Sequence, residues 1–237
     1  MTEQEHPDSG AFSGEDGHEG RGSRRFGRRV FVGLVAVVAV GVVAGAAATG
    51  LVGKVAGGVK RAMTPTPVYT GFHIYAPAGI PVFDPAAWTL TVDGLVDKPL
   101  SLTHAELRQL PFVSEVKNFH CVTGWSVKNV EWGGIRVSTL LDMARPKADA
   151  KFVTFYSMDG VFSDSLSIAD LARPEVLLAY DMYRKPLTAP HGSPLRLIVP
   201  SMYGYKAPKW INRMELKETE DLGYWEIRGH PVDATVN

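Results

Sequence analysis

The sequence predicts an α+β fold with a strand-rich core. Residues 71–237 contain several short runs of β-branched and aromatic residues that end at glycine, proline or aspartate, which is typical of strands. The helix signals are short, and no regular β-α-β alternation occurs. Apolar residues make up 45% of the 237-residue chain, which is enough for a sizeable core.

The expected elements follow from alternation and capping signals. A capping box at Thr103 and Glu106 predicts the start of a short helix that Pro111 stops. Residues 137–144 are expected to be helical, and Ser167 begins a further short helix that ends before Pro174. The expected strands are residues 88–92, 112–119, 152–157, 161–166, 176–180, 195–199 and 210–217.

Residues 1–70 are expected to lie outside the folded domain. Residues 1–29 are poor in large apolar side chains and rich in charge, so we expect disorder. Residues 30–52 carry no charge and are long enough, as a helix, to cross a hydrocarbon core of ~30 Å. Residues 53–70 contain Gly57-Gly58 and two Thr-Pro pairs, which is typical of a linker. The folded domain is therefore predicted to be residues 71–237.

The apolar segment has the flanks of an export signal. Arg28-Arg29-Val30-Phe31-Val32 resembles a twin-arginine signal, and Ala46-Ala47-Ala48 offers a small-residue cleavage site. Arginines precede the segment, which favours an inside N-terminus. A cleaved signal and a retained transmembrane anchor are both open. In either case, we expect export across the cytoplasmic membrane of a bacterium, to a membrane-anchored, periplasmic or extracellular location.

Charge and cysteine content exclude some classes of function. The chain has 25 basic and 25 acidic residues, so its overall charge does not favour nucleic acid as a partner. A single cysteine cannot form an internal disulfide. No Cys-x-x-Cys pair occurs, so a structural zinc site is not expected.

The lone cysteine, Cys121, is the main candidate for chemistry. Polar His120 and Thr123 flank it, and Gly124 follows closely, where the backbone needs freedom. A lone cysteine is often an inert apolar residue. A Cys–His nucleophile would need a base other than adjacent His120, because neighbours on an extended chain point to opposite faces. A thiolate metal ligand needs no base, because the metal keeps the sulfur deprotonated. The residues alone leave these alternatives open.

Four segments, in order along the chain, carry a family resemblance. They read FHCVTGWS at 119–126, WGGI at 132–135, PLRLIVP at 194–200 and YGYKAPKW at 203–210. Together they resemble the sulfite-oxidase-like molybdopterin-dependent oxidoreductases, over roughly residues 71–231. The similarity is greatest to the compact bacterial exported branch, which includes the catalytic subunit of the periplasmic methionine sulfoxide reductase. The resemblance implies a sulfite-oxidase-type molybdopterin-binding fold.

The resemblance also implies the cofactor and the reaction. By analogy, Cys121 gives its thiolate to the molybdenum of a mononuclear cofactor with one molybdopterin, since a soft thiolate suits such a metal. The implied reaction is two-electron oxygen-atom transfer on a sulfoxide or a related small molecule. Such a cofactor is inserted before export, which fits the twin-arginine interpretation. A redox-silent exported binding domain, or a Cys-dependent hydrolase, is the alternative.

The family implies further site residues. Arg196 matches the position that grips the cofactor phosphate, as an arginine can do bidentately. Tyr203, and Trp125 beside Cys121, are expected on the substrate side of the metal. The other cofactor contacts implied are His191, Ser157, His73, Tyr75, Lys206, Ala207, Pro208 and Lys209.

The partners expected by analogy are few. Electrons would pass through a separate redox partner, such as a membrane haem or quinone-linked subunit. We expect a monomer that contacts the membrane through residues 30–52 if this segment is retained.

Overall fold

The computed structural model describes residues 69–236, which belong to a compact unit of residues 65–237. The predicted disordered tail, apolar helix and nearly all of the linker lie outside the described residues. Within residues 69–236, no helix is both long and apolar enough to cross a membrane.

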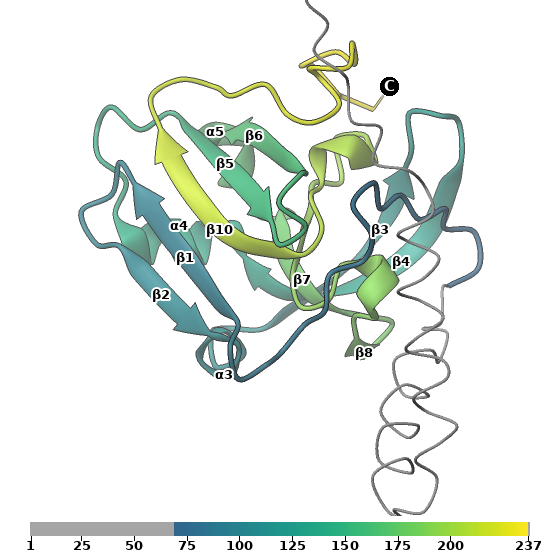
Figure 1. The fold of residues 1–237 in the computed structure, drawn as a ribbon, viewed down its shortest axis with the longest axis horizontal. Helices are drawn as coiled ribbons and strands as arrows, with labels where there is room; N and C mark the ends of the chain where they lie inside the picture. Colours follow the sequence, from purple (N-terminus) through teal and green to yellow (C-terminus); the bar gives the residue numbers. More distant parts are fainter. Residues whose placement is uncertain (1–68, 237) are drawn as a thin grey trace, which may run out of the picture. The chain divides into compact units, whose positions relative to one another are not determined.

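Two sheets form the framework (Figure 1). In the first sheet, β1 and β10 pair in parallel and the other neighbours are antiparallel. Its strands, in spatial order, are β2 (Leu100–Thr103), β1 (Thr89–Gly94), β10 (Ile211–Lys217), β5 (Phe152–Ser157) and β6 (Ser163–Ser167).

The second sheet is antiparallel. β3 and β4 form a long hairpin, and the turn between them carries Cys121. Strand β7 pairs with β4, β8 and β9. The bounds are β3 (Val113–His120), β4 (Ser126–Arg136), β7 (Leu177–Met182), β8 (Lys185–Pro186) and β9 (Arg196–Ile198).

The core is divided by the second sheet, because successive residues of a strand face opposite sides. Leu178 and Leu197 join the larger cluster, which also contains Phe155 and Met214 of the first sheet. Their neighbours Leu177 and Ile198 join a smaller cluster with Trp132 and Phe72. The smaller cluster supports the loops around Cys121, since Phe119 and Trp125 pack against it.

The helices are short, as predicted. Thr103 forms the expected capping box with Glu106, and Ser167 caps the helix that follows it. The helices are α3 (His104–Leu107), α4 (Val137–Ala144) and α5 (Ile168–Leu171), with 3₁₀ turns η1 (Ala189–His191) and η2 (Gly204–Lys206).

Strand β4 is the main element that the sequence did not predict. In the sequence, Gly133-Gly134 looks like a break between elements, yet both glycines pair with the neighbouring strands β3 and β7. A side chain at Gly134 would overlap the carbonyl oxygen of Leu178, and one at Gly133 would lie 2.9 Å from the ring of Phe112. The glycines therefore permit close approach of neighbouring strands rather than ending a strand.

Candidate active site

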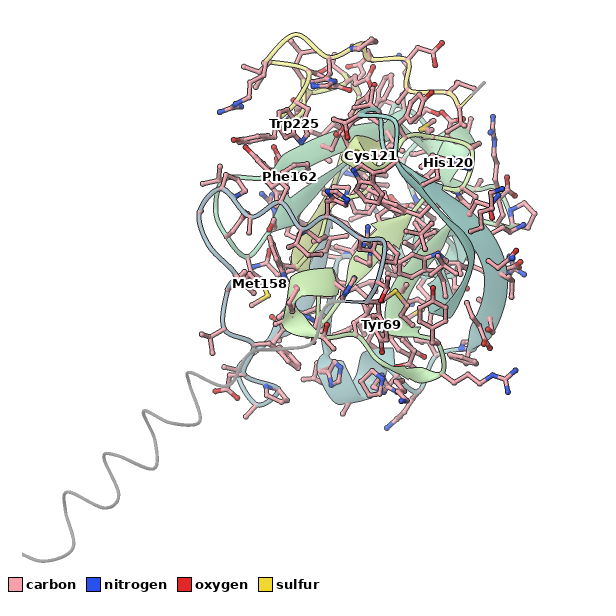
Figure 2. All side chains as sticks on the ribbon, turned by 90° about the vertical axis from the view of Figure 1, so that its right-hand side faces the viewer. Tyr69, His120, Cys121, Met158, Phe162 and Trp225 are labelled. Atoms are coloured by element: carbon pink, nitrogen blue, oxygen red, sulfur yellow. The ribbon has the colours of Figure 1, made fainter. Side chains whose placement is uncertain are left out.

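A cavity of about 410 Å³ opens beside Cys121. Its walls come from residues 72–77 before β1, the β3–β4 turn, the β5–β6 turn, the segment from Gly204 to Trp210 and the tail after β10. Figure 2 shows Cys121, Phe162 and Trp225, which are far apart in sequence, at the same end of the molecule. The tail lies near because Tyr224 N–H donates to Ser163 O, at 2.9 Å.

The β3–β4 turn presents the Cys121 thiol to the cavity. Cys121 N–H donates to Trp125 O at 2.9 Å, and Gly124 N–H donates to Cys121 O at 3.0 Å. Gly124 has φ +94, which only glycine adopts easily, so it closes the turn. The Cys121 Sγ lies 3.2 Å from the Thr123 hydroxyl, while the His120 Nδ1 lies 2.8 Å from the Ser126 Oγ. His120 does not line the cavity.

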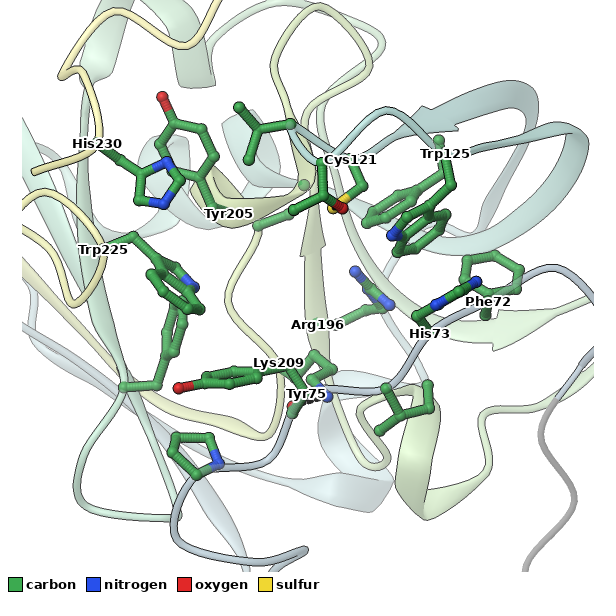
Figure 3. A pocket seen from close by; sticks show the side chains of 18 of the residues that line it. Phe72, His73, Tyr75, Cys121, Trp125, Arg196, Tyr205, Lys209, Trp225 and His230 are labelled. Carbon is green, nitrogen blue, oxygen red and sulfur yellow. Dashed lines mark hydrogen bonds between the residues drawn. The ribbon is translucent and has the colours of Figure 1, made fainter. Parts of the chain in front are cut away.

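Arg196 and Lys209 line the same cavity as Cys121 (Figure 3), and neither has an ion-pair partner among residues 69–236. Arg196 is only 4% exposed, and its guanidinium lies over the rings of Phe119 and Trp132 at 5.1 and 5.0 Å. Its Nη1 donates to His191 O at 3.1 Å, whereas its buried Nε has no partner within the described chain. Burial lowers the pKa of Arg196 to about 9.

The second cation is Lys209. Its Nζ donates to Tyr75 O at 2.8 Å and lies 4.1 Å from the Trp210 ring centre. Burial, and then the charge of Arg196, lower the pKa of Lys209 to about 7. No Asp or Glu of residues 69–236 lines the cavity. A buried cation is costly unless it meets an anion, so this pair is suited to a phosphate.

His191 is a preset hydrogen-bond donor beside Arg196. Its Nε2 accepts a hydrogen bond from Tyr69 N–H at 3.0 Å, which places the proton on Nδ1. That Nδ1 is buried and has no partner in the described part of the chain. Burial, and then Arg196 and Lys209, lower the pKa of His191 to about 4, so the ring is neutral. His191 is 0% exposed and does not line the cavity, so the orphaned Nε of cavity-lining Arg196 is the donor that fits a phosphate-bearing cofactor.

Lys206 is placed differently from the expectation. It does not line the cavity, and its ammonium is 2.7 Å from Asp164 and 2.8 Å from Ser165 O, and it also bonds Glu226. Burial raises the pKa of Asp164 to about 7, against the opposing effect of Lys206. The expected cofactor contact of Lys206 does not fit this arrangement, because carboxylates within the protein already surround the ammonium.

The other expected residues divide into two groups. His73, Tyr75, Ala207 and Lys209 line the cavity with Cys121 and Arg196, and His73 stacks on Trp125 at 5.1 Å. Three expected residues lie away from the cavity wall. The Tyr203 N–H donates to Ala234 O, the Pro208 carbonyl accepts from Leu197 N–H, and the buried Ser157 Oγ accepts from Asp159 N–H.

The sequence analysis did not predict several of the residues that line the cavity: Phe162, Tyr205, Trp225 and His230. Tyr205 lies within the YGYKAPKW segment, so its place in a signature was an available signal. The other residues lie in a turn and in a tail without strand or helix periodicity. For the tail, the adjacent aromatic pair Tyr224-Trp225 was the only hint.

Comparisons with known proteins show the family of this chain. Residues 77–225 match the family model described as "Oxidoreductase molybdopterin binding domain". The chain is 32% identical over 164 residues to the uncharacterized oxidoreductase YuiH of Bacillus subtilis, covering 69% of this chain and 82% of that protein.

Two further relatives have names that state an activity. The chain is 31% identical to the protein-methionine-sulfoxide reductase catalytic subunit MsrP of Campylobacter jejuni, covering 61% of this chain and 54% of that protein. It is 34% identical to a putative protein-methionine-sulfoxide reductase subunit, YedZ1, of Azospira oryzae, covering 62% of this chain and 55% of that protein. The chain therefore spans about half the length of these two relatives.

Among solved structures, the sulfane dehydrogenase SoxCD from Paracoccus pantotrophus has a similar fold. The TM-score is 0.56 at 22% identity, over 63% of this chain and 45% of that chain. The predicted strand-rich, sulfite-oxidase-type fold is thus confirmed. The chain belongs to the molybdopterin-binding oxidoreductase family and is a molybdenum-dependent oxidoreductase with a molybdenum–molybdopterin cofactor.

Proposed function

We propose that this protein reduces a sulfoxide or a related small molecule by oxygen-atom transfer at a molybdenum whose protein ligand is the Cys121 thiolate. The observation that carries the proposal is the Cys121 thiol on the wall of the cavity that also holds Arg196 and Lys209. Within residues 69–236, the Cys121 Sγ hydrogen-bonds the Thr123 hydroxyl and no histidine. A cysteine nucleophile would require such a base, so this arrangement favours a ligand over a hydrolase.

The proposed reaction is a two-electron reduction of the sulfoxide. The S–O bond of the sulfoxide breaks, the sulfur gains two electrons, and the oxygen leaves as water with two protons. When bound, the molybdenum–molybdopterin cofactor supplies two-electron oxygen-atom transfer and single-electron exchange with a partner. The chain contributes the soft Cys121 thiolate, while Arg196 and Lys209 would hold the phosphate.

Relatives support the substrate and the partner. By their names, MsrP and YedZ1 act on methionine sulfoxide in proteins. Both are also described as subunits, which supports a separate redox partner, such as a membrane haem or quinone-linked subunit, for this chain. Because the chain spans only about half of each, these properties are proposals for this protein.

We further propose that the protein is exported by the twin-arginine route, with residues 30–52 as the signal or anchor. The sequence of residues 28–32 supports this, and the segment lies outside the described residues. Changing Arg28-Arg29 to Lys-Lys should retain the protein in the cytoplasm of its host. Unchanged export on cell fractionation would refute the route.

The Cys121→Ser variant tests the proposed ligand. We expect sulfoxide reduction to fall to the rate of the enzyme-free control, because a hydroxyl is a poorer ligand than a thiolate for a sulfur-bound metal. The measurements are turnover with a reduced viologen dye, and the electron paramagnetic resonance spectrum of Mo(V), which should change in the variant. Unchanged turnover would contradict the assigned role.

Thiol labelling separates the ligand from a free nucleophile. In the holoprotein, Cys121 should resist iodoacetamide, and it should react after the cofactor is removed. Rapid labelling of the loaded protein would contradict metal ligation. A parallel turnover screen with sulfoxides and sulfite tests the substrate class, and activity with sulfite alone would overturn it.

A further inference from the structure

The cavity has an aromatic end that contains one of the predicted cofactor contacts, Tyr75. Figure 3 shows Trp225 and His230 on one side of the cavity and His73 and Trp125 on the other, with Cys121 and Arg196 between them. The rings of Tyr75 and Trp225 are 4.8 Å apart, and the His230 ring is 5.2 Å from both Trp225 and Tyr205. We call Tyr75, Phe162, Tyr205, Trp225 and His230 the aromatic end.

The aromatic end presents the rings of five side chains to the cavity. The Tyr205 hydroxyl donates to Pro231 O at 2.8 Å, and the Tyr75 hydroxyl lies 3.0 Å from that of Tyr224. These hydroxyls are therefore already engaged. No lysine, arginine or carboxylate belongs to the aromatic end. Lys209 lies at its border, since the Lys209 Nζ donates to Tyr75 O at 2.8 Å.

The two ends also differ in depth. Arg196 is 4% exposed, whereas Tyr75 is 45% exposed. Val161, next to Phe162, is 46% exposed, and Ile227, between Trp225 and His230 in the sequence, is 67% exposed. The aromatic end therefore borders solvent at Tyr75, and Arg196 lies deeper. A cofactor phosphate held by Arg196 and Lys209 leaves the outer, aromatic end to a molecule that enters from solvent.

We propose that the aromatic end is a substrate subsite that receives an apolar, preferably aromatic, substituent of a neutral sulfoxide. This inference rests on the proposed function and refines its substrate class. Aromatic rings 4.5–7 Å apart attract one another beyond their buried area, so a phenyl group should gain from Trp225. The subsite would thus favour methyl phenyl sulfoxide over dimethyl sulfoxide.

The tail that carries Trp225 is firmly held. The next residue, Glu226, bonds Lys206, and its Oε2 accepts from Gly223 N–H at 2.7 Å. A side chain on Gly223 would come within 2.7 Å of the Asp164 carboxyl. The backbone there therefore lies directly against the buried ion cluster formed by Lys206, Asp164 and Glu226. The cluster therefore fixes the position of Trp225, as a specificity subsite requires.

The test compares the two sulfoxides on the holoenzyme, with reduced viologen as the source of both electrons and solvent as the source of both protons. Trp225→Ala is expected to lower kcat/KM for methyl phenyl sulfoxide by roughly tenfold more than for dimethyl sulfoxide, the upper range of an aromatic pair. Trp225→Phe should restore most of the preference, because it retains a ring. Leu222→Ala, on the same tail at an exposed position outside the cavity, is the matched control.

A binding measurement separates this proposal from the proposed function. Calorimetric titration of the holoprotein with methyl phenyl sulfone and dimethyl sulfone, which mimic the sulfoxides, should show a phenyl preference that Trp225→Ala removes. Equal losses for both ligands, no loss, or release of molybdopterin from Trp225→Ala would overturn the subsite. Failure to reduce either sulfoxide, with the phenyl preference in binding intact, would overturn the proposed function instead.

Discussion

Replacing Lys206 by methionine should destabilise the folded protein by about 3–5 kcal/mol, the usual cost of removing one partner of a buried ion pair. The side chains of Lys206 and Asp164 are 3% and 0% exposed, and the Nζ–Oδ1 distance is 2.7 Å. Glu226, at 1% exposure, shares the same ammonium, and Glu220 lies 3.8 Å away. Methionine keeps the apolar stem, so the loss reports the charge.

The assay is urea denaturation of the purified protein at pH 7.5, followed by tryptophan fluorescence. The matched control is Lys151→Met, because Lys151 pairs with Glu218 at 3.5 Å with both side chains 61% exposed. That control should change stability by less than about 1 kcal/mol, as exposed pairs do. Adding Asp164→Asn to Lys206→Met should recover part of the loss, since one buried carboxylate is then neutral. A Lys206→Met loss no larger than that of the control would refute the reasoning.

Two further predictions concern Asp164 and Arg196. The pKa of Asp164 is raised from its ordinary 3.8 to about 7, so between these pH values the folded protein keeps a proton that the unfolded chain has lost. This contribution to stability is complete below pH 3.8 and disappears as the pH rises through 7. Asp164→Asn should flatten the fall in the urea midpoint between pH 4.5 and 7.5, and an unchanged slope would show that Asp164 does not retain the proton. Arg196→Ala should lower the molybdopterin content per protein, measured by the fluorescence of the released pterin, and normal occupancy would remove Arg196 from the anchor.

Local patterns predicted much of the fold. Residues 152–157 are a run of aromatic and β-branched residues before the Asp159-Gly160 turn, and they form β5 with those bounds. The capping box of Thr103 and Glu106 likewise marks the start of α3. Strand β4 was not predictable in this way, because Gly133 and Gly134 suit it through contacts with Phe112 and Leu178, which lie outside the strand.

The site shows the same limit more sharply. Lys206 and Lys209 belong to one sequence segment and were given one role, yet only Lys209 lines the cavity. The 3₁₀ turn η2 ends at Lys206. The Lys206 side chain contacts Asp164 of β6 and Glu226 of the tail, and both of these segments are distant from it in sequence. A signature can place a segment beside a cofactor, but it does not fix the direction of each side chain. Direction depends on long-range partners. Here Asp164 and Glu226 hold the Lys206 side chain away from the cavity, whereas Lys209 makes no ion pair within the described residues.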